Sequence, residues 1–330
     1  MQARPTWVIG AGGLLGKAVV KELKSRGVPV LTSKVPWGEP EAALTAFRDG
    51  AEKLRDAAAA GPWTIAWCAG AGVTGTSSAA LEAELSLFSR ALEAFEEILC
   101  NDGGHRGALF LASSAGGVYA GSSTPPFTEE SPVQPLAPYG FAKLRAEAAV
   151  TDFARRTGVR TLIGRVSNLY GPGQNLRKPQ GLISVFAKAH LTGAPVSVYV
   201  SLDTLRDYLF VDDASRLVVD GINRLVLPDI GAGTTVVKIL ASQRADTIGN
   251  LIGACRAIFK RRPLIILGAS PFAKAQAHDL RLKSVVWPEL DERPVTPLAV
   301  GINNTVQEVQ RLAISGALRS LPETEPARSR

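Results

Sequence analysis

The stretch Thr6-Trp-Val-Ile-Gly-Ala-Gly-Gly-Leu-Leu-Gly16 decides the fold of this chain. A short apolar run leads into a glycine-rich turn, and residues 17–26 then follow the pattern of an amphipathic helix. Strand, turn and helix in this order are the context in which glycines let a backbone approach the pyrophosphate of a dinucleotide. Amides at the start of a helix bind such phosphates. We therefore predict dinucleotide contacts at Gly10, Gly12, Gly13, Leu14, Leu15 and Gly16.

Apolar runs and helical patterns alternate over the first half of the chain. Further strands are predicted at 28–31, 63–68, 108–112 and 160–165, and helices at 39–60, 79–100 and 139–158. No strand is expected between Lys34 and Trp63. Such alternation is typical of an α/β fold with a doubly wound parallel (Rossmann) sheet.

The pattern loosens beyond Asn168, which indicates a smaller C-terminal α/β substrate lobe. Helices are expected at 182–191, 214–224 and 248–260, and strands near 235–240 and 264–267. We assign 1–168 to a dinucleotide-binding Rossmann domain, with 203–224 packing back on it. The segments 169–202 and 225–320 are assigned to the substrate-binding lobe, and the polar residues 321–330 to a loose tail.

The composition fits a globular protein with one large domain and a smaller lobe. The 330 residues are 46% hydrophobic and 20% charged. No apolar run reaches the roughly 18 residues of a membrane span, and the N-terminus lacks the apolar core of a signal peptide. Cys68, Cys100 and Cys255 are odd in number and lack metal-ligand spacing. We therefore expect reduced thiols, no metal, no membrane partner and a cytoplasmic location.

The net charge of +7 does not indicate a nucleic-acid partner. The basic residues are dispersed, and the densest short cluster is Lys260-Arg261-Arg262. No basic run interleaves with aromatic residues. A phosphate-bearing cofactor or substrate accounts for a mild positive excess equally well.

The ends of two predicted strands indicate where the cofactor lies. An NAD-binding chain usually carries an acidic residue about 20 positions beyond the glycine turn, for the ribose 2′-hydroxyl. Here Ser33 and Lys34 stand in that region, and a cation with a hydroxyl favours the 2′-phosphate of NADP(H) over NAD(H). The alternative is a solvent-facing loop lysine. The small residues after the strand 63–68 leave space for the ligand, so Cys68, Ala69 and Gly70 are further predicted contacts.

Tyr139 and Lys143 stand one helical turn apart, so both can point into one site. A cation near a phenol favours the ionised form, and Pro138 in the first turn would place the helix dipole in the same sense. Such a tyrosine can exchange a proton with an alcohol oxygen, as a hydride-transfer enzyme requires. The alternative is that Lys143 pairs with Glu147 on the surface.

Together with several further motifs, these residues resemble the extended short-chain dehydrogenase/reductases, in particular the NAD(P)-dependent epimerase/dehydratase family that acts on nucleotide sugars. The resemblance spans roughly residues 5–310. It is carried by the glycine turn, Ser113-Ser-Ala-Gly-Gly-Val-Tyr119, Tyr139-x-x-x-Lys143, Asn168-Leu-Tyr-Gly-Pro-Gly173 and Arg206-Asp-Tyr-Leu-Phe-Val-Asp-Asp213.

The resemblance implies roles for single residues. Tyr139 is the acid/base, Lys143 assists it and holds the nicotinamide ribose, and Ser114 hydrogen-bonds the reacting oxygen, with Ser113 as the alternative one residue away. A further alternative is that either serine only caps the following turn. Asn168 and Arg206 become substrate contacts, with the guanidinium on the diphosphate. The alternative for Arg206 is an ion pair with Asp207 or Asp213. The cofactor contacts implied in the same way are Ser113, Tyr139, Lys143 and Arg165.

The chain also departs from the family pattern. Dehydratases of the family carry an Asp-Glu pair after the catalytic hydroxyl, whereas this chain has Ala115-Gly116, which disfavours dehydration. Gln276 stands where a second diphosphate-binding arginine is expected, and Arg281 is a candidate substitute.

Three functions remain open from the sequence. The first is an epimerase of a nucleotide-activated sugar, which oxidises and re-reduces one hydroxyl through a keto intermediate. The alternative is an NADPH-dependent reductase of a keto-sugar or related carbonyl, and a third is a non-catalytic dinucleotide sensor on the same fold. The resemblance further implies a homodimer through the helices 81–100 and 144–154.

Overall fold

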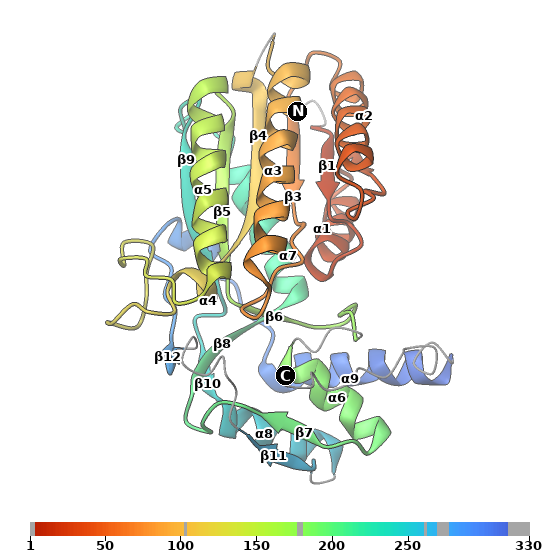
Figure 1. Cartoon of the computed structure of the whole chain (residues 1–330), viewed down its shortest axis with the longest axis vertical. Coiled ribbons are helices and arrows are strands. Elements are labelled where there is room, and N and C mark those ends of the chain that lie inside the picture. The colour runs from red at the N-terminus through yellow and green to blue at the C-terminus, as the bar shows by residue number, and fades with distance from the viewer. Residues whose placement is uncertain (1–3, 102–103, 177–180, 261–262, 269–276, 316–330) are drawn as a thin grey trace.

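The structure is a computed structural model, and it describes residues 4–101, 104–176, 181–260, 263–268 and 277–315. A large body, in which helices cover both faces of one sheet, stands above a smaller body built from short strands and helices (Figure 1). Within the described residues, no helix has the length and apolarity needed to cross a membrane.

The large body is organised around a six-stranded parallel sheet in the order β2-β1-β3-β4-β5-β9. Its strands are β1 (Thr6–Ile9), β2 (Val30–Thr32), β3 (Trp63–Trp67), β4 (Gly107–Ser114), β5 (Arg160–Val166) and β9 (Thr235–Leu240). The order reverses direction at β1, so the chain winds outward on both sides of this strand. The predicted doubly wound fold is confirmed.

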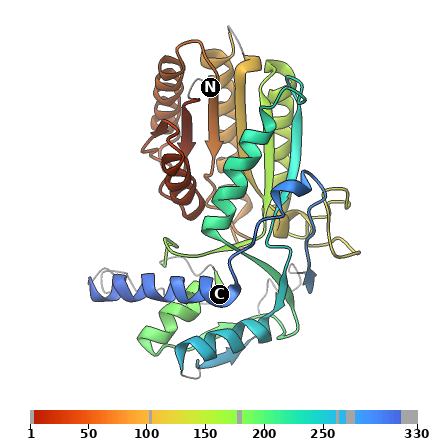
Figure 2. The same ribbon diagram turned by 180° about the vertical axis from the view of Figure 1, so that it is seen from behind.

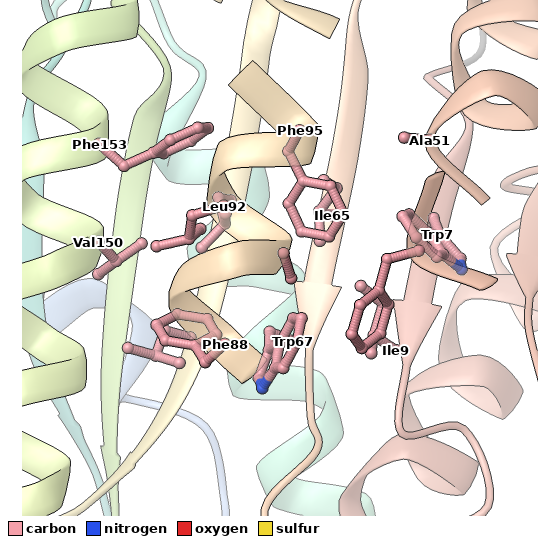
Figure 3. Close-up of a cluster of buried hydrophobic side chains, with 14 of the residues drawn as sticks. Trp7, Ile9, Ala51, Ile65, Trp67, Phe88, Leu92, Phe95, Val150 and Phe153 are labelled. Atoms are coloured by element: carbon pink, nitrogen blue, oxygen red, sulfur yellow. The ribbon is translucent and has the colours of Figure 1, made fainter. Parts of the chain in front are cut away.

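Helices cover both faces of this sheet. One face carries α2 (Pro40–Ala58), α3 (Ser78–Leu99) and α5 (Pro138–Thr157), which stand in front of the strands in Figure 1. The other face carries α1 (Leu14–Ser25) and α7 (Val211–Leu225), seen in Figure 2. Under the first layer, Trp7, Trp67, Phe88 and Phe95 form a buried aromatic cluster with edge-on contacts (Figure 3). This cluster packs α3 against β1 and β3.

The smaller body is built on a second sheet and on one further pair of strands. A second sheet holds β6 (Asn168–Tyr170), β8 (Leu205–Phe210), β10 (Ala245–Thr247) and β12 (Asp279–Leu280), and β7 (Val196–Val198) pairs with β11 (Ile265–Leu267). An apolar cluster packs these strands against α6 (Leu182–Thr192), α8 (Ile248–Phe259) and α9 (Leu298–Ile314). The short helical segments are η1 (Gly104–Arg106), α4 (Ala115–Val118) and η3 (Pro288–Leu290).

The domain assignment made from the sequence needs one correction. The strand 235–240 was placed in the substrate lobe, but β9 pairs along its length with β5 and completes the main sheet. Its Ile239 and Leu240 are fully buried there. Lys238, also fully buried, donates to Ser284 and Asp291, so the segment that follows β12 returns to the large body. The chain thus crosses between the bodies more often than the sequence indicated.

Other boundaries differ little from the predictions. Helix α1 begins at Leu14 rather than at residue 17, and β2 begins two residues later and ends one residue later than expected. The segment between Thr32 and Trp63 holds only α2, so the expected absence of a strand there is confirmed. The predicted tail 321–330, Gln276 and the pair Arg261-Arg262 lie outside the described residues.

Candidate active site

The glycine turn is packed too tightly for side chains at two positions. Gly10 has φ +84°, and a Cβ atom on it would lie 2.6 Å from the backbone nitrogen of Ala69. A Cβ on Gly16 would lie 2.1 Å from the carbonyl oxygen of Gly10. By contrast, a Cβ on Gly12 would meet no atom within 4 Å. The turn is therefore closed toward the protein and open at Gly12.

The first turn of α1 is free to accept an anion. Its N-cap residue, Gly13, makes no side-chain cap hydrogen bond, and no acidic residue stands in the first turn. Gly12 and Gly13 are exposed, Leu14 is half-buried and Leu15 is buried in the core behind the turn. Uncapped amides at the positive end of a helix suit a diphosphate. The glycine turn thus fits the dinucleotide predicted for it.

Of the two residues after β2, Ser33 has a hydrogen-bond partner for its side chain and Lys34 has none among the described residues. Ser33 is half-buried and accepts a hydrogen bond from the indole Nε1 of Trp7 at 3.1 Å. Lys34 is exposed, and no hydrogen bond or ion pair of its side chain occurs among the described residues. The ammonium of Lys34 is therefore available at the carboxyl end of the edge strand.

The end of β3 lies against both the glycine turn and the Tyr139 helix. The amide of Cys68 donates to the carbonyl of Ile9 at 2.9 Å. Burial of the sulfur raises the pKa of Cys68 to about 12, so this residue stays a neutral thiol. A Cβ on Gly70 would lie 3.2 Å from Nζ of Lys143. Cys68, Ala69 and Gly70 therefore form the floor between the turn and Lys143.

Tyr139 and Lys143 occupy the start of α5. Pro138 stands in the first turn, as predicted, because its fixed φ and missing N–H suit that position. Nζ of Lys143 lies 5.7 Å from the ring centroid of Tyr139 and donates to the carbonyl of Ala112 at 3.4 Å. The alternative pairing of Lys143 with Glu147 is not formed, since Glu147 binds Arg165 instead.

Two glycines leave room for the Tyr139 ring. A Cβ on Gly117 would lie 3.0 Å from Cε1 of this ring, and one on Gly72 would lie 3.4 Å from its Cδ2. The helix itself approaches α4 closely, because a Cβ on Gly140 would lie 2.2 Å from the carbonyl oxygen of Gly117. Tyr139 is therefore held between backbone segments and remains half-buried.

The structure separates the two serines at the end of β4. Ser114 caps α4 and accepts from the amide of Gly117 at 3.2 Å, the residue that also borders the Tyr139 ring. Ser113 is buried and donates to Oε1 of Glu147. The hydroxyl of Ser113 is thus bound to the buried Glu147, one turn beyond Lys143, whereas Ser114 binds the residue that borders the Tyr139 ring. This arrangement favours Ser114.

Arg165 lies in a buried network rather than in an open groove. It donates to both carboxylate oxygens of Glu147, at 3.1 and 2.7 Å, and to the hydroxyl of Tyr119 at 2.6 Å. Burial alone would lower the pKa of Arg165, but its bonds to Glu147 outweigh this effect and raise it. Burial raises the pKa of Tyr119. The cofactor contacts assigned to Arg165 and Ser113 therefore meet side chains whose polar groups are already occupied.

Asn168 and Arg206 lie on adjacent strands where the two bodies join. The amide of Asn168 donates to the carbonyl of Asp207 at 2.9 Å. Arg206 is 8% exposed, and its guanidinium donates to the carbonyls of Leu205 and His278. Neither alternative ion pair forms, because Asp207 accepts from Ser242 and the amide of Arg244, and Asp213 pairs with Arg216.

Burial lowers the pKa of Arg206, because no carboxylate compensates its charge by direct contact within the described part of the chain. An anion bound here would remove that cost. The charge of Asp279 opposes this lowering of the pKa of Arg206, but Asp279 is itself paired with Arg281 at 2.8 Å. The candidate substitute Arg281 is thus engaged, and Arg206 is the less committed cation.

The sequence analysis missed one residue of the site. Glu84, on α3, accepts from the amide of Ala71 at 3.1 Å. A Cβ atom on Gly70 would lie 3.5 Å from one of the carboxylate oxygens of Glu84, and it would also lie close to Nζ of Lys143. The two charged groups therefore face the same backbone position. No local motif marks this position, because the contact arises only when α3 packs against the end of β3. Glu84 brings a negative charge to the floor of the site.

The described residues thus place a dinucleotide turn, a Ser/Tyr/Lys cluster and a buried arginine along one end of the sheet. The family described as the NAD dependent epimerase/dehydratase family matches residues 6–256. The chain belongs to this family, and the resemblance drawn from the motifs is confirmed. The family is described as NAD dependent, so a dinucleotide is the class of cofactor.

Two curated relatives match parts of the chain and differ in activity. A dTDP-4-dehydro-6-deoxyglucose reductase of Escherichia coli is 32% identical over 105 residues, which are 32% of this chain and 33% of that protein. A putative UDP-glucose 4-epimerase of Methanocaldococcus jannaschii is 30% identical over 126 residues, 38% of this chain and 41% of that protein. The chain thus matches between a third and about two fifths of these relatives' length.

A solved structure matches nearly the whole chain. MoeE5 in complex with UDP-glucose and NAD superposes with a TM-score of 0.76 at 21% identity, covering 94% of this chain and 99% of that one. At this identity the similarity shows the fold. It confirms the Rossmann body with a smaller C-terminal lobe.

Proposed function

We propose that this chain is a nicotinamide-dependent epimerase of a nucleotide-activated sugar. The observation that carries the proposal is the cluster at the start of α5, where Lys143 lies beside the ring of Tyr139 and Gly117 joins that ring to Ser114. Arg206 is buried and contacts no carboxylate among the described residues, which supports a substrate that carries a diphosphate. Asn168, one strand away, would position the sugar next to it.

The chain's own residues divide the work in this proposal. The turn Gly10–Gly16 and the first turn of α1 would hold the diphosphate of the cofactor, and Lys143 its nicotinamide ribose. When bound, the nicotinamide supplies a hydride acceptor and donor. Tyr139 would take the proton of the sugar hydroxyl and return it, while Ser114 orients the sugar oxygen.

A keto-sugar reductase is the second candidate. It would use Ser114, Tyr139 and Lys143 in the same way, but would consume a reduced cofactor at each turnover. The uncommitted ammonium of Lys34 supports it, because a 2′-phosphate is the anion that this position suits. One relative named a reductase is consistent with it, whereas MoeE5 holds NAD. NADP(H) preference therefore rests on Lys34 alone. A non-catalytic dinucleotide sensor has no need of the Ser/Tyr/Lys cluster.

A dehydratase is the least supported enzymatic reading. Ala115 and Gly116 follow Ser114 at the start of α4, where a dehydratase of this family would place two carboxylates. Neither residue can abstract or deliver a proton. We propose that the reaction returns or adds hydride without loss of water.

The homodimer expected through α3 and α5 remains a prediction. On their outer surface, Arg145 pairs with Glu82 and Arg156 pairs with Glu96, and all four side chains are at least a third exposed. A dimer through this face would have to accommodate these pairs. Its existence can be checked by light scattering of the purified protein.

The test of the function begins with the bound cofactor. We would denature the purified protein, identify any released nicotinamide dinucleotide, and assay the native protein with UDP-glucose in the absence of added cofactor. Retained NAD⁺ and conversion of the sugar without added cofactor are expected for the epimerase. Stoichiometric consumption of NADPH with a 4-keto-sugar would favour the reductase. A protein that binds no dinucleotide would contradict both.

A further inference from the structure

Trp37 is a large aromatic residue whose exposure the core does not explain. It is 46% exposed, whereas Trp7, Trp63 and Trp67 are 5% exposed or less. It stands in the short segment between β2 and α2, where the chain passes to the helix without forming a further strand. Exposing about half of an indole forfeits apolar burial, which favours a ligand that covers it.

The indole is held in place from one side. It makes edge-on contacts with Phe47, at a centroid separation of 5.8 Å, and with Trp67 at 6.3 Å. The backbone amide of Trp37 donates to the carbonyl of Val35, a buried residue, and the backbone amide of Glu39 donates to the carbonyl of Pro36. The ring is therefore fixed against the aromatic core rather than free to rotate into it.

The position of Trp37 follows from its contact with Trp67. Trp67 ends β3, and the next residue, Cys68, bonds to the end of β1. The following residue, Ala69, packs against Gly10 of the glycine turn. Trp37 thus contacts Trp67, and the residue two positions after Trp67 packs against the phosphate-binding turn. Lys34 precedes Trp37 in the same short segment. In a doubly wound sheet, the adenosine half of a dinucleotide lies over the carboxyl end of the second strand.

We propose that Trp37 stacks on the adenine of the cofactor. Among the described residues β2 is the edge strand of the main sheet, so no strand beyond it supplies a wall for the base, and the segment 33–39 connects β2 to α2. An indole face provides stacking that suits a purine and tolerates either form of the 2′ position. The inference rests on the proposed function, since it requires a dinucleotide at this turn.

The first experiment compares dissociation constants of purified variants. We expect Trp37→Ala to weaken NADH and 5′-ADP about tenfold or more, while nicotinamide mononucleotide binds as to the wild type. Trp37→Phe, which keeps a smaller aromatic face, is expected to lie within about threefold of the wild type. Tyr199→Ala is the matched control, because Tyr199 is 49% exposed but lies in the smaller body.

The outcomes separate this inference from the proposed function. Unchanged affinities of Trp37→Ala for 5′-ADP would overturn the stacking role and leave the epimerase proposal intact. Equal losses for 5′-ADP and nicotinamide mononucleotide would also overturn it, since they indicate a general disturbance. A wild-type protein that binds no dinucleotide would overturn the proposed function itself.

A second measurement does not require Trp37→Ala to fold. Stacking of a purine on an indole quenches its emission, and Trp37 is the most exposed of the five tryptophans. We expect 5′-AMP to quench the fluorescence of the wild type and to lose most of this effect with Trp37→Phe. Equal quenching of both proteins would contradict the proposal.

Discussion

Helix α5 presents two sets of polar side chains only one turn apart. Near its start, Tyr139 and Lys143 lie half-buried, and their polar atoms have few protein partners. One turn later, Glu147 is buried and binds both Arg165 and Ser113. The first set stands at the carboxyl end of the sheet, and the second lies below it, against β4 and β5.

The difference shows which charged side chains can bind a ligand. We call a side chain committed when its polar groups are already bound within the protein, as in Glu147, and uncommitted when they are largely unbound, as in Lys143. The ion pair Glu147–Arg165 is bidentate and buried, so it serves the packing of α5 on the sheet. Lys143 is bound to one backbone carbonyl only, and can therefore still bind a ligand. Variants in the first set should change turnover, and variants in the second should change stability.

The largest effect is expected for Tyr139→Phe. Loss of the phenol oxygen removes the proposed acid/base, so turnover should fall roughly 10²–10⁴-fold. The phenyl ring keeps its place between Gly72 and Gly117, so the thermal midpoint and the affinity for NADH should stay close to the wild type. Steady-state kinetics with UDP-glucose and calorimetry measure both. Turnover near the wild-type rate would remove Tyr139 from the catalytic assignment.

The next effect concerns the committed set. Glu147→Gln leaves the buried guanidinium of Arg165 without its carboxylate, which is expected to cost about 3–5 kcal/mol of unfolding free energy. Urea unfolding measures this loss. Glu82→Gln is the control, because the Glu82–Arg145 pair is exposed and its loss should not measurably change stability. Equal stability of the two variants would show that Glu147 is not a structural anchor.

Local patterns were sufficient for the parts of the site that one segment builds. The glycine turn with α1, and Pro138 with the helix that carries Tyr139, are found where the sequence placed them. Each depends on residues within a few positions, where turn geometry and helix periodicity act directly.

Contacts between distant segments could not be read in this way. Ser113 and Ser114 are adjacent in the sequence, and only the packing of α4 and α5 shows that Ser113 binds Glu147 while Ser114 binds Gly117. The pairing of Arg165 with Glu147, and of β9 with β5, likewise joins segments that no local pattern connects. Glu84 enters the site only through the packing of α3, so it was missed.

The third prediction concerns Arg206, a buried cation that is expected to bind the diphosphate of the substrate. Arg206→Gln should weaken a nucleoside-diphosphate ligand by roughly 10–150-fold, as expected for the loss of a charged hydrogen bond of about 1.5–3 kcal/mol. Titration with UDP measures this loss. Arg281→Gln is the control, because Arg281 already pairs with Asp279. A loss confined to Arg281→Gln would place the diphosphate on that residue instead.

The smallest effect is expected at Lys34, the exposed cation beyond β2. Replacing it by Asp reverses the charge that the 2′ position would meet, so preference should move from NADPH toward NADH by about tenfold or less. The shift should shrink as salt is added, because exposed charges are screened. Lys53→Asp, on the exposed side of α2, controls for the change in net charge. If Lys34→Asp and Lys53→Asp give the same ratio of NADPH to NADH affinity, Lys34 is only a loop residue and does not contact the cofactor.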